Sequence, residues 1–154
     1  MAAYFCDASG IAKRYLHETG TAWVQALANP SAGNRLFLAR ITTVEVVSAV
    51  TRRQRGGHLL PAEAAAILAQ FRLDLAAEDG IIEITPALLS QAMTLAETHA
   101  LRAYDAVQLA ATLDLQASRT AIGLPPITLL SADRDLNLAA TASGVLVDDP
   151  NLHP

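Results

Sequence analysis

The sequence predicts an α/β domain in which helices flank a central, mainly parallel five-stranded sheet. Short apolar runs, each suited to one buried strand, alternate with longer segments of helical periodicity, and this alternation is typical of parallel sheets. The length of 154 residues and the hydrophobic content of 52% suit one domain with a substantial core. No repeat, low-complexity tract or linker divides the chain, so we expect residues 1–154 to form a single domain.

The five predicted strands are short and apolar, as expected of strands that are covered on both faces. In chain order they are residues 4–6, 36–41, 81–84, 127–130 and 145–147. Helical patterns fill the intervals, at residues 11–27 (two short helices broken near Gly20), 43–55, 61–78, 86–99, 104–118 and 133–143. Prolines and glycines mark several boundaries, since Pro61 and Pro86 stand where helices begin, and Gly56 and Gly144 stand where helices end.

Bulk features of the chain exclude several classes of protein. No window approaches the roughly 18 consecutive apolar residues of a membrane span, and the start lacks the charged and apolar regions of a signal peptide. We therefore expect a cytoplasmic protein with no membrane association. The single cysteine, Cys6, has no partner for an internal disulfide, and its place in an apolar strand predicts a small buried hydrophobic residue.

Four acidic residues stand at the ends of predicted strands or the starts of predicted helices. Asp7 follows the first strand, Glu45 comes just after the second, Asp105 lies at a helix start, and Asp133 follows the fourth strand. Ligands of parallel sheets gather beyond the carboxyl ends of the strands, so we expect the four side chains to meet there. Four carboxylates in one place repel one another unless a cation joins them. Carboxylates and water suit Mg²⁺ or Mn²⁺, and the four acids together therefore predict a divalent-metal site.

Each acid also has a purely structural explanation. Asp7 and Asp133 are suited to cap helix N-termini. Glu45 would complete a capping box that begins at Thr42, and Asp105 in a first turn would favour the helix dipole. For any one of the acids alone we prefer this structural explanation, and only their convergence favours the metal site.

Other chemistries lack their motifs. No pair of histidines or cysteines has the spacing of a zinc site, and the glycine motifs of phosphate loops, dinucleotide folds and nucleophile elbows are absent. An aspartyl-phosphate phosphatase would carry a second acid two residues after Asp7, where the chain has Ser9. The histidines are scattered and are expected to be ordinary surface or helix-end residues: His17, His58, His99 and His153.

Four segments resemble, in order, the motifs of PIN-domain ribonucleases, and most of all those of VapC-type toxins of bacterial toxin–antitoxin pairs. The segment YFCDASGIAKRYLHETG carries Asp7, TTVEVVSAVTRR carries Glu45, LRAYDAVQLAAT carries Asp105, and LLSADRDLNLAATASGV carries Asp133. The resemblance covers essentially the whole chain. The first motif departs from the usual pattern at Ala8, where the family commonly has a hydroxyl residue.

The resemblance implies a metal-dependent endoribonuclease with a PIN-like fold. Asp7, Asp105 and Asp133 would hold one Mg²⁺ or Mn²⁺, while Glu45 would share a second ion or position the nucleophile. The metal would activate water for attack on an RNA phosphorus, and the products would carry a 5′-phosphate and a 3′-hydroxyl. The implied partners are RNA as substrate, a cognate antitoxin protein and a second copy of the chain in a homodimer. Two hydroxyl residues would support the metal and its waters: Ser9 and Ser131.

Two points within this assignment stay open. Asp135 lies two residues beyond Asp133 and competes with it for the place of the fourth acid. The position of Asp133 directly after a predicted strand favours Asp133, and Asp135 then becomes a solvated residue of the first helical turn. The acids are compatible with one ion or with two.

The formal net charge of −4 is unusual for a protein that handles nucleic acid. Setting aside the four candidate ligands leaves 11 of the 15 acidic residues, equal to the 11 lysines and arginines. Attraction of phosphate would therefore depend on bound metal and on local basic clusters. The clearest cluster is Arg52, Arg53 and Arg55 near a helix end, which would either contact RNA or remain solvated and complement the helix dipole.

Two other functions are compatible with the same residues. One is a catalytically silent PIN-like module that binds RNA or protein, against which the four intact acids argue. The other is a metal-dependent phosphohydrolase that acts on small substrates, which would need a closed pocket instead of an open groove.

Overall fold

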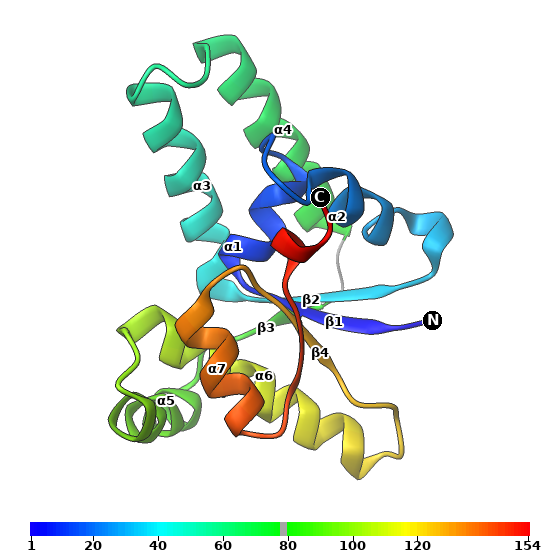
Figure 1. Cartoon of the computed structure of the whole chain (residues 1–154), viewed down its shortest axis with the longest axis vertical. Helices are drawn as coiled ribbons and strands as arrows, with labels where there is room; N and C mark the ends of the chain where they lie inside the picture. Colours follow the sequence, from blue (N-terminus) through cyan, green and yellow to red (C-terminus); the bar gives the residue numbers. More distant parts are fainter. Residues whose placement is uncertain (78–79) are drawn as a thin grey trace.

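Five parallel strands form the central sheet in the spatial order β3-β2-β1-β4-β5 (Figure 1). The computed structural model describes residues 1–77 and 80–154. At the centre of the sheet, Phe5 of β1 is in register with Phe37 of β2 and Leu129 of β4. All four strand pairings are parallel, which confirms the predicted fold class. The strands are β1 (Ala3–Cys6), β2 (Arg35–Ala39), β3 (Ile81–Ile82), β4 (Thr128–Leu130) and β5 (Leu146–Asp148).

Helices cover both faces of the sheet, with α1 to α4 on one side and α5 to α7 on the other (Figure 1). No helix in the described part of the chain is both long and apolar enough to cross a membrane. The helices are α1 (Ala8–Ile11), α2 (Thr21–Leu27), α3 (Arg40–Arg55), α4 (Pro61–Ala77), α5 (Pro86–His99), α6 (Ala103–Ala121) and α7 (Arg134–Ala142), with short 3-10 helices η1 (Ala12–Arg14), η2 (Pro30–Ala32) and η3 (Pro150–Leu152).

Each face of the sheet has its own hydrophobic core. Successive residues of a strand point to opposite faces, so the neighbours Phe5 and Cys6 enter different cores. Phe5 packs with Leu109 on the side of α5 to α7, whereas Cys6 packs with Val46 and Phe71 on the side of α1 to α4. Cys6 is fully buried, which confirms its predicted role as a small hydrophobic residue.

The second strand is shorter than predicted. It ends at Ala39, and α3 begins at Arg40, so the predicted strand over residues 36–41 is wrong in its last two positions. Short apolar runs fit a strand and a buried helical turn equally well, and here Ile41 packs against the core from the helix. Thr42 is consequently inside the helix, not at its N-cap, and the capping box predicted for Thr42 and Glu45 does not form.

Smaller differences follow from exposed or capping residues. The strand predicted over residues 81–84 ends at Ile82, after Ile81 and Ile82 have paired with β2. It stops there because Glu83 is exposed and forms an ion pair with Arg40, and Thr85 caps α5. The helix predicted to start at Tyr104 begins at Ala103 and extends to Ala121. The predicted end of the alanine-rich helix at about Glu78 lies outside the described residues.

The C-terminal residues close over the start of the chain. The ring of His153 stacks on Trp23, with centroids 3.9 Å apart, and pairs with Asp148 at 2.7 Å. Asn151 of η3 accepts a hydrogen bond of 2.9 Å from the buried ammonium group of Lys13. These contacts fasten the chain end to the segment that follows Asp7.

Candidate active site

Two of the predicted site residues begin helices at the ends of neighbouring strands. Asp7 follows β1 and is the N-cap of α1, where its carboxylate accepts a hydrogen bond of 2.8 Å from the backbone N–H of Gly10. Asp133 comes after β4 and is the N-cap of α7, where Oδ1 accepts a bond of 2.9 Å from Leu136. The structural explanation for both acids is therefore confirmed, but capping leaves carboxylate oxygens that still face the sheet edge.

The other two acids reach the same edge from within helices. Asp105 lies in the first turn of α6, as predicted. Glu45 lies further along α3, is half-buried, and its Oε2 accepts a hydrogen bond of 2.9 Å from the side-chain amide of Gln108. The same amide nitrogen donates to Thr42 Oγ1 at 2.8 Å, so Gln108 joins α6 to α3 beside the candidate site.

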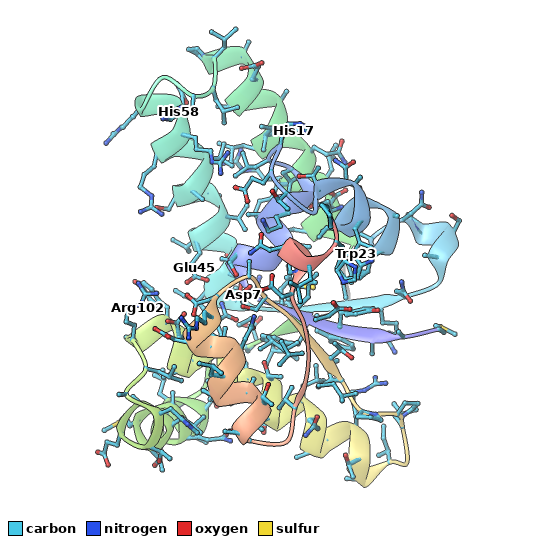
Figure 2. All side chains as sticks on the ribbon, in the orientation of Figure 1. Asp7, His17, Trp23, Glu45, His58 and Arg102 are labelled. Carbon is cyan, nitrogen blue, oxygen red and sulfur yellow. The ribbon has the colours of Figure 1, made fainter. Side chains whose placement is uncertain are left out.

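All four predicted acids line one cleft of about 250 Å³, which we call the acid cleft. It is also lined by Ala8, Ser9, Arg102 and Tyr104. Figure 2 shows Asp7, Glu45 and Arg102 gathered at one side of the molecule, whereas His17 and His58 lie toward the end of the molecule formed by α3 and α4. The predicted convergence at the carboxyl edge is thus observed.

Ser9 and Ser131 connect the ends of β1 and β4 around Asp7. Ser9 Oγ donates to the Asp7 carboxylate at 2.8 Å from Oδ1 and accepts from the backbone N–H of Ala132 at 2.9 Å. Ser131 is fully buried, and its hydroxyl accepts from the backbone N–H of Asp133 at 3.1 Å. A hydrogen-bonded bridge therefore fixes Asp7 against the segment that leads to Asp133.

Close backbone packing adds to this bridge. A Cβ atom at Gly10 would lie 2.3 Å from the carbonyl oxygen of Leu130, so only glycine lets α1 approach β4 this closely. The backbone N–H of Asp7 also donates to the carbonyl oxygen of Leu130 at 3.2 Å. The position of Asp7 is set by the main chain as well as by its side chain.

The environment of Asp7 disfavours a negative charge. Burial raises its pKa to about 7, even though hydrogen bonds from Gly10, Ser9 and Ser131 act in the opposite direction, and the charge of Glu45 raises it further. Among the described residues no lysine, arginine or histidine forms an ion pair with Asp7. Within the described residues, the negative charge of Asp7 is thus stabilised by hydrogen bonds and not by a protein cation.

Two of the remaining acids show the same tendency. Burial, followed by the charge of Asp105, raises the pKa of Glu45, and the bond from Gln108 partly offsets this. Burial and the charges of Asp133 and Asp135 raise the pKa of Asp105, while Arg102 lowers it. Mutual repulsion of this kind is relieved by a hard divalent cation, for which carboxylates and hydroxyls are suitable ligands.

The side chains do not yet surround an ion. In the part of the chain that the structure describes, no three His, Cys, Asp or Glu side chains are close enough together to hold a metal as they stand. The donor set nevertheless fits Mg²⁺ or Mn²⁺ in chemistry, because it consists of oxygen atoms with an excess of negative charge. Because Asp7 is held by Ser9 and Gly10, the other acids would have to move toward it to complete a metal site.

The competing acid Asp135 points elsewhere. It is exposed and lines a different cavity, of about 490 Å³, together with His99 and Leu138. Asp133, by contrast, lines the acid cleft. Asp133 as the fourth acid stays a prediction, since the charge of Asp135 also acts on Asp105.

Two residues beside the acids were not predicted. Arg102 bonds to Asp105 and Asp133, and Gln108 bonds to Glu45. Both lie three residues from Asp105, one before it and one after it, and residues at this spacing share a helix face. The motif around Asp105 therefore contained a signal for both side chains, although the identity of their partners depends on the other helices.

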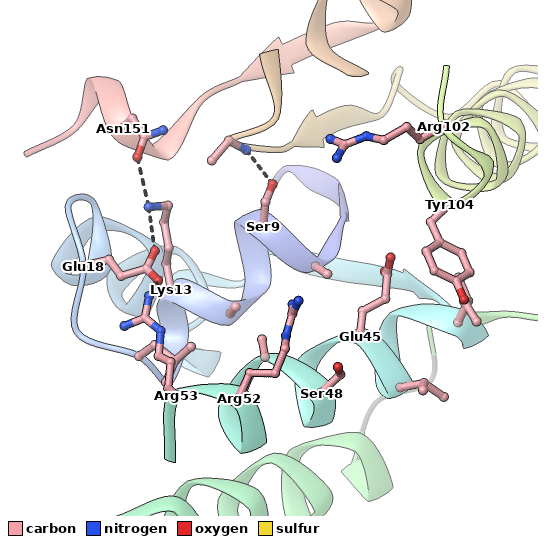
Figure 3. Close-up of a pocket in the computed structure, with 17 residues that line it drawn as sticks. Ser9, Lys13, Glu18, Glu45, Ser48, Arg52, Arg53, Arg102, Tyr104 and Asn151 are labelled. Atoms are coloured by element: carbon pink, nitrogen blue, oxygen red, sulfur yellow. Dashed lines mark hydrogen bonds and ion pairs between the residues drawn. The ribbon is translucent and has the colours of Figure 1, made fainter. Parts of the chain in front are cut away.

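The acid cleft opens into a larger groove of about 770 Å³, which we call the long groove (Figure 3). Ser9, Glu45 and Arg102 line both spaces. From there the long groove follows α3 to Arg52 and Arg53. An extended chain placed in the long groove would therefore pass Glu45, the one of the four acids that lines both spaces.

The predicted basic cluster is divided by its surroundings. Arg52 is exposed and lines the long groove, while Arg55 is exposed but does not line it. Arg53 lines the long groove but forms an ion pair with Glu18, which also pairs with Lys13 at 3.1 Å. Arg52 is thus the member of the cluster best placed to meet a ligand.

Comparison with known proteins gives relatives over the full length of the chain. Ribonuclease VapC45 of Mycobacterium tuberculosis strain CDC 1551 / Oshkosh and ribonuclease VapC49 of strain ATCC 25618 / H37Rv are each 30% identical over 154 residues, which is 100% of both sequences in each case. No protein-family model matches the chain.

Solved structures support the same fold. PAE2754 from Pyrobaculum aerophilum has a TM-score of 0.61 at 20% identity, covering 98% of this chain and 85% of its own. FitAcB from Neisseria gonorrhoeae has a TM-score of 0.59 at 21% identity, covering 96% and 97%. VapC20 of Mycobacterium tuberculosis, a Sarcin-Ricin loop cleaving toxin, has a TM-score of 0.59 at 18% identity, covering 98% and 99%.

Proposed function

Because the chain belongs to the VapC family of PIN-domain ribonucleases, we propose that it is a metal-dependent endoribonuclease that acts as the toxin of a toxin–antitoxin pair. The observation that carries this proposal is the acid cleft, where four carboxylates from four different segments line one space that opens into the long groove. The substrate is RNA, and the reaction is hydrolysis of a phosphodiester bond.

Asp7, Asp105 and Asp133 are the proposed metal ligands. Asp7 supplies a fixed carboxylate, since Ser9 and Gly10 hold it in place. Asp133 supplies Oδ2, because its Oδ1 caps α7. Mg²⁺ or Mn²⁺ bound there would promote ionisation of water and offset the negative charge that develops at phosphorus.

Glu45 is the proposed acceptor of the proton that water loses as its oxygen attacks phosphorus. It faces the acid cleft, and Gln108 favours its ionised form through a hydrogen bond. The bond from phosphorus to the 3′ oxygen breaks and that oxygen takes a proton from solvent water, which leaves a 5′-phosphate on one product and a 3′-hydroxyl on the other. Arg52 lies along the long groove where it would contact a backbone phosphate.

The shape of the site favours this function over a phosphohydrolase for small substrates. The acid cleft is continuous with the long groove and is not closed, as a pocket for a small phosphate ester would be. The presence of all four acids in one cleft likewise favours catalysis over a silent binding module. A cognate antitoxin and a homodimer complete the proposal, and both rest on membership of the family alone.

A nuclease assay on total cellular RNA tests the proposed function. We expect cleavage with Mg²⁺ or Mn²⁺, none with chelator, and a loss of about 100-fold or more in Asp105→Asn, because the amide keeps the shape but loses the ligand charge. Asp114→Asn is the matched control, since Asp114 lies on the same helix but is exposed and outside the acid cleft. Undiminished cleavage by Asp105→Asn, or equal cleavage in chelator, would remove the mechanism.

A further inference from the structure

Arg102 is the one lysine or arginine that lines the acid cleft among the described residues. Its Nε lies 3.4 Å from Asp105 Oδ2, and its Nη2 lies 3.2 Å from Asp133 Oδ2. A single guanidinium thus bridges two of the proposed metal ligands. Its own side chain is 78% exposed, so water and solutes reach it freely.

The helix that Arg102 precedes does not explain its presence. Arg102 is the N-cap of α6, but its side chain makes no capping bond. Asp, Asn, Ser and Thr are the residues that cap helices well, and a positive charge at a helix N-terminus opposes the helix dipole. The favourable contacts of the Arg102 side chain are instead those to Asp105 and Asp133.

Arg102 and a metal ion would require the same oxygen atoms. Asp133 Oδ1 is engaged by the backbone of α7, which leaves Oδ2 for an ion, and Oδ2 is the atom that Arg102 contacts. The guanidinium and a divalent ion therefore cannot both hold this oxygen in the same way. Asp7 and Glu45 face no such competitor within the described residues.

The Arg102 side chain also has an alternative position, in the long groove, once it releases the carboxylates. Arg102 lines the long groove as well as the acid cleft, and in Figure 3 its side chain points inward from the side of the pocket opposite Arg52 and Glu45. An exposed arginine can change rotamer without movement of the backbone. Guanidinium groups bind phosphate oxygens with well-directed hydrogen bonds.

We propose that Arg102 is an exchangeable counter-ion: it holds Asp105 and Asp133 when no divalent ion is present, releases them to the ion, and then binds a phosphate of RNA in the long groove. The inference rests on the proposed function, because it assigns a role to a residue next to the proposed metal ligands. It makes Arg102 a competitor of the metal and a substrate-binding residue only after the metal is in place.

The first test is calorimetric titration of Mg²⁺ and of Mn²⁺ into the protein without RNA. Arg102→Gln should bind each ion about three- to tenfold more tightly than the wild type, because a competing ion pair has been removed. Arg134→Gln is the matched control, since Arg134 begins α7 and removes the same charge near the same edge without lining the acid cleft. We expect its affinity to change by less than about twofold.

The second test measures affinity for labelled single-stranded RNA as a function of salt. It uses the Glu45→Gln background, which slows cleavage but keeps Asp105 and Asp133. Adding Arg102→Gln should reduce the salt slope by about one unit when Mg²⁺ is present and should leave it unchanged in chelator. A reduction in both conditions would show that Arg102 binds phosphate without exchange, which would overturn the proposal.

The calorimetry separates this inference from the function beneath it. If the wild type binds neither ion, the metal-dependent function itself fails. If the wild type binds metal but Arg102→Gln binds it no more tightly than Arg134→Gln does, only the exchange fails. Weaker metal binding by Arg102→Gln would likewise overturn the exchange, because Arg102 would then be holding the ligands in place for the ion. Thermal melts of the variants in chelator establish that each is folded.

Discussion

Asp7 is 4% exposed and is held by hydrogen bonds from Ser9 and Gly10, whereas the side chains of Asp105 and Asp133 are 16% and 23% exposed and share the guanidinium of Arg102. We call the first group, with Ser131, the buried wall of the acid cleft, and the second, with Arg102, the open wall. The buried wall fixes a carboxylate that pairs with no lysine, arginine or histidine in the described part of the chain. The open wall balances its charges with a side chain that is free to move.

This difference teaches how one site can be both ordered and adaptable. A carboxylate held by backbone and hydroxyl groups keeps its position whether or not a cation is present, so it preorganises the site. Carboxylates paired with an exposed arginine gain little from the pair, since exposed ion pairs contribute at most about 1 kcal/mol. The metal would therefore encounter one rigid ligand and two that are easily released.

The largest expected difference between the two walls is in the free energy of unfolding measured without metal, and it concerns Asp7. The pKa of Asp7 is about 7 in the folded protein, against 3.8 for an unperturbed aspartate, so its contribution to stability is fully present below pH 3.8 and is lost as pH rises through about 7. We expect Asp7→Asn in chelator to be more stable than the wild type by about 2–4 kcal/mol at pH 8 and by little at about pH 4.

Denaturant titrations at several pH values measure this effect. In the open wall, Asp105→Asn should be as stable as the wild type or slightly more stable in chelator, because Asp105 is less buried and is paired with Arg102. A loss of stability in Asp7→Asn at pH 8 would mean that capping of α1 outweighs the cost of burying the charge. The buried wall would then be an ordinary helix cap.

An effect of medium size on the pH dependence of cleavage is expected at Gln108. Its side-chain amide donates a hydrogen bond to Glu45, much as Ser9 and Gly10 donate to Asp7 in the buried wall. Gln108→Met keeps the volume but removes the bond that lowers the pKa of Glu45, so we expect the acid limb of the pH–rate profile to move to higher pH. Cleavage at neutral pH should fall about tenfold, with recovery at higher pH. Gln116→Met on the same helix is the control, since the side-chain oxygens of both glutamines are buried without a partner.

The readout distinguishes positioning from simple packing. If Gln108 only packs α6 against α3, Gln108→Met lowers the melting temperature but leaves the pH profile where it was. That result would mean that the bond from Gln108 does not control the ionisation of Glu45. Asp7 would then be the one acid of the cleft whose charge is governed by hydrogen bonds.

The smallest effect concerns the basic residues along the long groove. Arg52→Ala should weaken RNA binding and reduce its salt slope by about one unit, because Arg52 lines the long groove. Arg55→Ala should leave the slope unchanged, and Arg53→Ala should change it less than Arg52→Ala does because Arg53 is paired with Glu18. A salt slope equal to that of the wild type in all three variants would show that the cluster consists of solvated helix-end charges.

The order of strands and helices and the convergence of four acids were predictable from the sequence. Apolar runs separated by helical periods predict a parallel sheet, and the rule that ligands gather at carboxyl ends brings Asp7 and Asp133 together. The end of β2 was not predictable, because Ile41 buries its side chain equally well from a strand or a helix. The pairing of Arg53 with Glu18 was also beyond prediction, since it depends on how α3 packs against a distant loop.

The burial of Asp7 has the largest effect on its pKa, and it cannot be read from any sequence motif. Its unusual pKa arises from the closeness of β4 and α1 in three dimensions, and the same residue at a looser helix start would be an ordinary solvated cap. Spacing along α6 contained a signal for Arg102 and Gln108, but their contacts required the positions of Asp133 at the N-cap of α7 and Glu45 on α3.

Gly10 sets the width of the space between α1 and β4. A methyl group at this position would lie 2.3 Å from the carbonyl oxygen of Leu130, which is closer than van der Waals contact allows. Even alanine, the smallest replacement, would have to lift α1 from the sheet and carry Asp7 away from Ser131. Substitutions at residue 10 would therefore be poorly tolerated, although the side chain of Gly10 is a single hydrogen atom. The dimensions of the site thus depend on a residue that takes no part in its chemistry.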